Sequence, residues 1–197
     1  MDFLKTRGTI KRPMYPIKEP AFLGYGGFPA ATCISIDEQV VHGFPSDRII
    51  EEDQIVSVGV GAYFNGFHGD AARSLYVGHI SPEKKKLIDV TRECFFEGIK
   101  GICIGSALGD IGAQVQEHAE KNGFSVVRDM VGHGVGRNLH EDPSVPNYGR
   151  RGVGVRLKRN MTIAIEPMIN LGRADDRYWK VQPDSLSHAD RPSKQHL

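Results

Sequence analysis

Three side chains that could hold a metal ion lie far apart in the sequence, and the first of them is Asp70. It falls within residues 67–73, FHGDAAR, which are apolar enough to be buried. An unpaired carboxylate in such surroundings costs several kcal/mol unless a cation, a metal ion or a set of hydrogen-bond donors meets it. We therefore predict that Asp70 faces a metal ion, and that distant segments supply the other ligands.

The other two candidate ligands are His133 and Glu166. His133 lies between two glycines, which lets the backbone pack closely and leaves the imidazole projecting from a strand or a tight bend. Glu166 follows the alternating apolar residues of segment 161–170, so it comes at the end of a predicted strand and requires a partner. A salt bridge from Glu166 to an arginine is the alternative to metal binding.

Carboxylate oxygens and an imidazole nitrogen together suit a divalent ion such as Mn, Fe, Co or Zn. Such an ion lowers the pKa of a bound water from about 15.7 toward about 7, which is the basis of metal-assisted hydrolysis. His42 and His140 are candidates to hold or protonate a substrate, although a hydrogen-bonded histidine at a strand end is an equal alternative for His42. HGxG also occurs in oxyanion loops, but no GxSxG nucleophile turn accompanies it.

The predicted elements position these residues on strands. Residues 55–77 predict a β-hairpin, because apolar and small residues alternate and Asn65-Gly66 tolerates the positive φ of a tight turn. Amphipathic helices are predicted from Pro82 to about residue 101, with the face Leu87, Ile88, Thr91, Cys94, Phe95 and Ile99, and over about 107–122, with the face Leu108, Ile111, Val115 and Ala119. Short strands are predicted at 32–36, 124–127 and 161–170.

Composition limits the class of protein. The 197 residues fit one domain, and 25 Lys+Arg against 24 Asp+Glu give no field that would attract nucleic acid or a membrane. Three cysteines without a CxxC motif and an amino terminus without an apolar signal region favour a cytoplasmic location. We expect an extended or disordered arm at 1–20, one catalytic domain at 21–187 and a disordered tail at 188–197.

Five blocks in order make the chain resemble the type I methionine aminopeptidases over about residues 21–187. They are FLGYGGFPAATCISID, VVHGFPSDRIIEEDQIVSV, GAYFNGFHGDAAR, SVVRDMVGHGVGRNLHEDPSVPNYG and IAIEPMIN. The resemblance implies an α+β, pita-bread (creatinase/aminopeptidase-like) fold, with a curved antiparallel sheet backed by helices and here incomplete at both ends. It also implies removal of the initiator methionine from new polypeptides that have a small second residue.

The resemblance assigns roles to individual residues. The family binds two metals through two Asp, one His and two Glu, and Asp70, His133 and Glu166 match three of these five ligands. His42 and His140 match the two histidines that contact the substrate and the tetrahedral intermediate, so with Glu166 they form the expected catalytic set. The expected methionine pocket is lined by Tyr25, Phe28, Cys33 and Trp179, with Leu139 where an aromatic residue is common.

The chain departs from this pattern in three places. Gly59 stands where the family has its first Asp, eleven residues before Asp70. The final Glu belongs to a strand after a serine-rich segment, but this chain continues from Ser187 into HADRPSKQHL, where Asp190 is the only nearby substitute. The arm at 1–20 replaces the family's amino-terminal helices. We therefore expect at most one tightly bound ion.

The leading hypothesis is a metalloaminopeptidase with impaired activity, acting as a monomer on peptides or nascent chains and on neither nucleic acid nor membrane. One alternative is a non-catalytic pseudoenzyme that binds N-terminal peptide segments, which Gly59 favours. Another is metal-free catalysis with a histidine base, as in creatinase-like relatives. The retention of Asp70, His133 and Glu166 argues against this last alternative.

Overall fold

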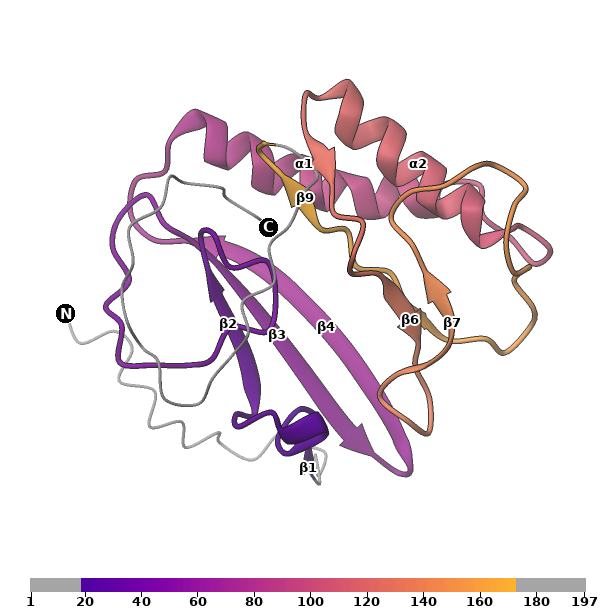
Figure 1. Ribbon diagram of the computed structural model, residues 1–197, viewed down its shortest axis with the longest axis horizontal. Coiled ribbons are helices and arrows are strands. Elements are labelled where there is room, and N and C mark those ends of the chain that lie inside the picture. Colours follow the sequence, from indigo (N-terminus) through magenta and orange to yellow (C-terminus); the bar gives the residue numbers. More distant parts are fainter. Residues whose placement is uncertain (1–18, 173–197) are drawn as a thin grey trace.

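A long antiparallel hairpin forms the largest sheet of the computed structural model, which describes residues 19–172. Its strands are β3 (Ile55–Phe64) and β4 (Phe67–Tyr76), shown side by side in Figure 1. Asn65 and Gly66 form the turn with φ of 50° and 85°, the positive values that a tight hairpin needs. The predicted hairpin is confirmed, and its register places Gly61 opposite Asp70.

Two further strands pair with β3 on the edge that β4 leaves free. β2 (Thr32–Ile36) pairs along its first half, and β1 (Glu19–Pro20) pairs near its end. The short helix η1 (Tyr25–Gly27) lies between β1 and β2 in the chain. Since alternate residues of a strand share a face, Gly59 and Asp70 lie on the same face of this sheet.

The second half of the described chain adds two small antiparallel groups. β6 (Gly132–Gly134) lies between β7 (Glu141–Val145) and β8 (Ile163–Ala164). β5 (Ser125–Val126) pairs with β9 (Ile169–Asn170). Figure 1 shows β6 and β7 near the lower part of β4, so the hairpin and this second group approach each other.

The prediction of one continuous strand over 161–170 is wrong. The segment forms β8 and β9, which pair with different partners, and residues 165–168 between them belong to neither strand. Pro167 lies in this break and has no N–H to donate to a sheet, which explains why the strand cannot continue. Glu166 therefore projects from an irregular segment between two strands.

Two packed helices support the strands: α1 (Pro82–Ile99) and α2 (Leu108–Lys121). The predicted inward face of α2 is confirmed, because its apolar residues are buried. The predicted face of α1 is correct only in part, since Phe95 and Ile99 are 36% and 38% exposed and Val90 is buried instead. Gly98 explains the shift: a Cβ there would lie 2.7 Å from Val115, so α2 packs closely along this line. Neither of these described helices is long and apolar enough to cross a membrane.

Lys84 ties the start of α1 to the sheet. Its Nζ lies 3.3 Å from Asp37 Oδ1 and 3.6 Å from Asp53 Oδ2, and it also donates to the backbone carbonyl of Asp53. The side chains of Lys84 and Asp37 are only 13% and 14% exposed. A buried carboxylate is thus neutralised where the β2–β3 connection meets the helix.

We predict that Lys84→Met lowers the free energy of unfolding by about 1.5–3 kcal/mol, because the largely buried Asp37 carboxylate would lose its cationic partner. Urea unfolding followed by circular dichroism measures the change. Lys85→Met is the matched control, because Lys85 pairs with Asp89 at the surface and should barely shift the midpoint. Equal shifts for the two variants would contradict the assignment.

Candidate metal centre

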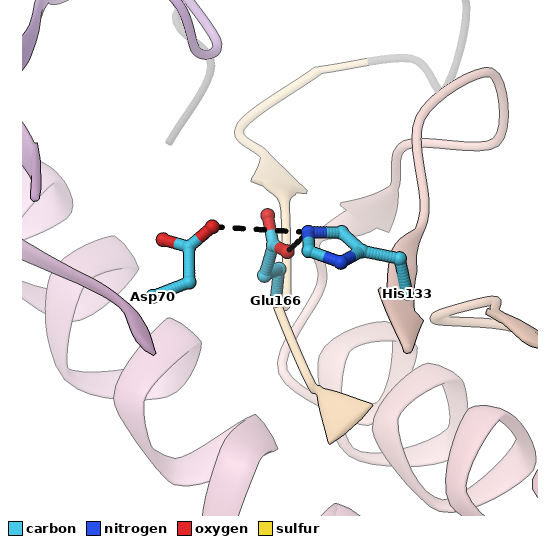
Figure 2. Close-up of side chains that lie close together, drawn as sticks. All are labelled: Asp70, His133 and Glu166. Atoms are coloured by element: carbon cyan, nitrogen blue, oxygen red, sulfur yellow. Dashed lines mark ion pairs between the residues drawn. The ribbon is translucent and has the colours of Figure 1, made fainter. Parts of the chain in front are cut away.

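The three predicted metal ligands converge in space (Figure 2). Asp70 projects from β4, His133 from β6 and Glu166 from the break between β8 and β9. His133 Nε2 lies 3.1 Å from Glu166 Oε1 and 3.8 Å from Asp70 Oδ2. One ligand atom from each residue lies within 4.8 Å of the others. His133 and Glu166, which follow Asp70 by 63 and 96 positions in the sequence, thus lie beside it in space.

A backbone carbonyl fixes the tautomer of His133. Its Nδ1 lies 2.7 Å from the carbonyl oxygen of Gly134, which can only accept a hydrogen bond. Nδ1 therefore carries a proton, and in the neutral imidazole Nε2 presents a lone pair to the two carboxylates. This arrangement is common for metal-binding histidines, where the second nitrogen donates to a carbonyl or carboxylate.

The separations fit one small divalent ion. Ligand atoms about 2.1 Å from an ion are roughly 3.0–3.5 Å apart in tetrahedral or octahedral geometry. The observed distances of 3.1 and 3.8 Å from His133 Nε2 are close to this spacing. Glu166 Oε1 is buried, and apart from the ion pair with His133 Nε2 it meets no polar partner among the described residues. Its lone pair is therefore available to a cation.

The electrostatics of the cluster also favour a cation. Burial and, next, the neighbouring Glu166 carboxylate raise the pKa of Asp70, and His133 opposes this rise. The pKa of His133 is raised mainly by Glu166 against its ring, with burial acting in the opposite direction. Both shifts show that two carboxylates close together attract positive charge, which a divalent ion supplies.

His42 and His140 lie beside the cluster. Both line a cavity of about 190 Å³ together with His133 and Glu166. His42 is not in a strand and has φ of 59°, an uncommon value for a residue other than glycine, so the alternative of a histidine at a strand end does not describe it. The cavity therefore brings together the two histidines expected to contact a substrate and two of the metal ligands.

His140 is held by contacts on both sides of its ring. Its Nδ1 lies 2.9 Å from the hydroxyl of Tyr25, and the two rings stack with centroids 5.1 Å apart. The His133 ring lies 4.0 Å away, centroid to centroid. Partial burial and then the neighbouring His133 lower the pKa of His140, so the ring is neutral near pH 7. Tyr25, expected in the methionine pocket, thus also orients a histidine.

The other residues expected in the methionine pocket are less closely gathered. Cys33 lies in β2, and burial, with Asp70 as the next cause, raises the pKa of its thiol to about 11. Phe28 packs against Phe44, with ring centroids 5.3 Å apart, and lines neither of the two cavities at the site. Leu139 is fully buried and also lines neither cavity. Trp179 and Asp190 lie outside the described residues, as does most of the predicted arm and all of the predicted tail.

Several residues at the site gave no chemical signal in the sequence. Met130, Val131 and Met168 line the smaller cavity, and only their place beside a predicted ligand segment could have indicated this. A second, more open cavity of about 490 Å³ adjoins His133 and His140. Its wall includes Glu141, Asp142 and Ser144, three polar residues of β7.

Comparison with known proteins agrees with this geometry. The model of metallopeptidase family M24 matches residues 7–182. The chain belongs to this family. Methionine aminopeptidase of Clostridium acetobutylicum is 54% identical over 172 residues, which are 87% of this chain and 65% of that protein. Methionine aminopeptidase 1 of Bacillus subtilis is 43% identical over 183 residues, 93% of this chain and 69% of that one.

Solved structures distinguish two branches of this family. The crystal structure of methionine aminopeptidase from Thermotoga maritima has a TM-score of 0.82 and 46% identity, covering 90% of this chain and 71% of that one. Prolidase from Pyrococcus furiosus has a TM-score of 0.62 and 26% identity, covering 70% and 41%. The chain therefore resembles the methionine aminopeptidases more strongly than the prolidases.

These comparisons confirm the predicted family and the pita-bread, α+β class of the M24 chain. Its relatives are metallopeptidases, so a divalent metal is the cofactor expected at the cluster of Asp70, His133 and Glu166. The chain spans 65% and 61% of the lengths of the two clostridial relatives, slightly less than two thirds.

We predict that divalent metal stabilises the fold through this cluster. A ligand that binds the folded chain alone, at 100 times its dissociation constant, adds about 2.7 kcal/mol. Thermal unfolding with Mn²⁺ should therefore begin at a higher temperature than with a chelator, and Asp70→Asn should abolish the difference. Asp142→Asn is the matched control, because Asp142 is an exposed carboxylate nearby that is not part of the cluster. A response that survives in Asp70→Asn would place the metal elsewhere.

Proposed function

We propose that this M24 chain is a metalloaminopeptidase that releases methionine from the amino terminus of peptides and nascent proteins. The convergence of Asp70, His133 and Glu166 beside a cavity that contains His42 and His140 supports the proposal most directly. The names of the chain's relatives support the same activity.

A divalent ion held by the three ligands would supply Lewis-acid activation of water. The protein's own groups do the rest. His140 Nδ1 lies 2.9 Å from the Tyr25 hydroxyl, and we propose that the hydroxyl donates this hydrogen bond. The ring proton then stands on Nε2, where it can be given to a peptide oxygen or nitrogen. His42, on the same cavity, is placed to contact the substrate, and Glu166 to accept a proton from the attacking water and return it to the departing amine.

We propose that one ion, rather than two, is tightly bound. Among the described residues, three side chains can share one ion: Asp70, His133 and Glu166. Gly59 lies on the same face of the sheet as Asp70, but it has no side chain that could bind a second ion. Three protein ligands with open positions still match an ordinary catalytic site, so activity should be reduced rather than lost.

The substrate pocket is proposed from the family pattern. Cys33, whose thiol stays protonated, and the aromatic residues Tyr25, Phe28 and Trp179 are expected to hold the methionine side chain. A peptide or nascent-chain terminus is the partner, and a cytoplasmic location and a monomeric state remain predictions. The non-catalytic alternative is not proposed, because Asp70, His133 and Glu166 converge and two of them share a cavity with His42 and His140.

Release of methionine from a Met-Ala or Met-Gly peptide, with added Mn²⁺ or Co²⁺, tests this activity. We predict measurable turnover by the unmodified chain and loss to background for His133→Ala, because the ring that joins both carboxylates would be gone. His79→Ala should keep full activity, since His79 is exposed and lies outside the site. Binding of the peptide without turnover would contradict the proposal.

A second substitution tests the number of ions. We predict that Gly59→Asp raises the metal content from about one toward two ions per chain, or tightens binding about tenfold or more. A Cβ at Gly59 would lie 3.3 Å from Cys33 Cβ and 3.6 Å from the Phe22 ring, so Cys33 has to shift by a few tenths of an ångström to accept it. Gly59→Ala is the matched control for the added Cβ. Equal metal content in the two variants, measured by elemental analysis, would show that the assigned geometry is wrong.

A further inference from the structure

The segment that carries Glu166 needs support from outside the sheets. Residues 165–168 belong to neither β8 nor β9, so no strand ladder fixes the backbone of Glu166. Its carboxylate nevertheless has to face His133 Nε2, only 3.1 Å away. A group that holds this backbone would therefore control the geometry of the cluster.

Strand order brings one segment to the right place. β6 carries His133 and is antiparallel to both β7 and β8, so these two flanking strands run in the same direction and end beside Gly132. Glu166 follows the end of β8 by two residues, and Asn147 follows the end of β7 by two residues. The two residues thus emerge at the same end of β6, on opposite sides of it.

The side chain of Asn147 crosses this gap. Its Nδ2 donates a hydrogen bond of 2.6 Å to the backbone carbonyl of Glu166. Asn147 is 1% exposed, and its Oδ1 has no hydrogen-bond partner in the part of the chain that the structure describes. Burying an amide whose oxygen makes no hydrogen bond costs free energy. The hydrogen bond to Glu166 is the contact that offsets this cost.

We infer that Asn147 is a positioning residue that clamps the Glu166 backbone past the end of β6 and so directs its carboxylate to the metal. Its amide nitrogen contacts the backbone carbonyl of Glu166, not the carboxylates or the imidazole, so it acts through Glu166. The consequence for metal binding rests on the proposed function, whereas the clamp itself does not.

The clamp is tested first without metal. Hydrogen–deuterium exchange of the full chain in a chelator should be about tenfold faster over residues 162–170 in Asn147→Ala, with little change in α1 and α2. Asn147→Leu, which fills the space without a donor, serves if the alanine variant does not fold. Gln114→Ala is the matched control, because Gln114 Nε2 donates 2.9 Å to the carbonyl of Gly98 away from the site. Uniform acceleration, or none at 162–170, would overturn the inference.

Titration calorimetry with Co²⁺ tests the consequence. We expect Asn147→Ala to weaken Co²⁺ binding about 10–100-fold, the range for residues that orient metal ligands, and Gln114→Ala to leave it unchanged. A purely structural role would lower stability in both variants and leave Co²⁺ affinity intact, which would overturn the inference. If the unmodified chain binds no Co²⁺, the proposed metal site fails, and the exchange experiment still decides whether the clamp exists.

Discussion

Two carboxylates and an imidazole that meet in a partly buried space favour the binding of a cation. Asp70 and Glu166 both lie within 4 Å of His133 Nε2, and burial together with the nearby Glu166 carboxylate raises the pKa of Asp70. Nδ1 of His133 donates to the Gly134 carbonyl, so Nε2 is the ring atom that faces the two carboxylates. One divalent ion would balance the two carboxylates and bind Nε2. The surrounding structure is the frame that holds these three side chains together.

That frame is built from separate pieces of the chain. The β3–β4 hairpin presents Asp70, the short strand β6 presents His133, and the break after β8 presents Glu166. The packed helices α1 and α2 and the Lys84 ion pairs hold the connections between these pieces. Because the ligands come from independent elements, the site depends on tertiary packing more than on any local motif. This dependence explains why a single buried amide, Asn147, can matter for a carboxylate that it does not touch.

The sequence predicted that Asp70, His133 and Glu166 come together, because charged and imidazole side chains among apolar and small residues are conspicuous. Asp70 among small and apolar residues, His133 between glycines and Glu166 beside an apolar run each violate local patterning, and such violations mark functional sites. The prediction that the segment around Asp70 is buried is wrong, because most residues of β4 are exposed and only the Asp70 side chain, 16% exposed, turns into the cluster. The hairpin and the inward face of α2 followed from equally clear periodicity. The strand break at Pro167 was missed, because alternation on both sides of it concealed a change of partner. The contacts of Asn147 and Tyr25 could not be predicted, since each joins segments that only the tertiary fold brings together.

Anomalous X-ray diffraction from crystals grown with Zn²⁺ tests the central claim most directly. The account predicts one strong peak about 2.0–2.2 Å from His133 Nε2 and from a carboxylate oxygen of both Asp70 and Glu166. A second, weaker peak beside Gly59 would be compatible with loose binding there. No peak among these three side chains, with zinc bound elsewhere on the chain, would contradict the account.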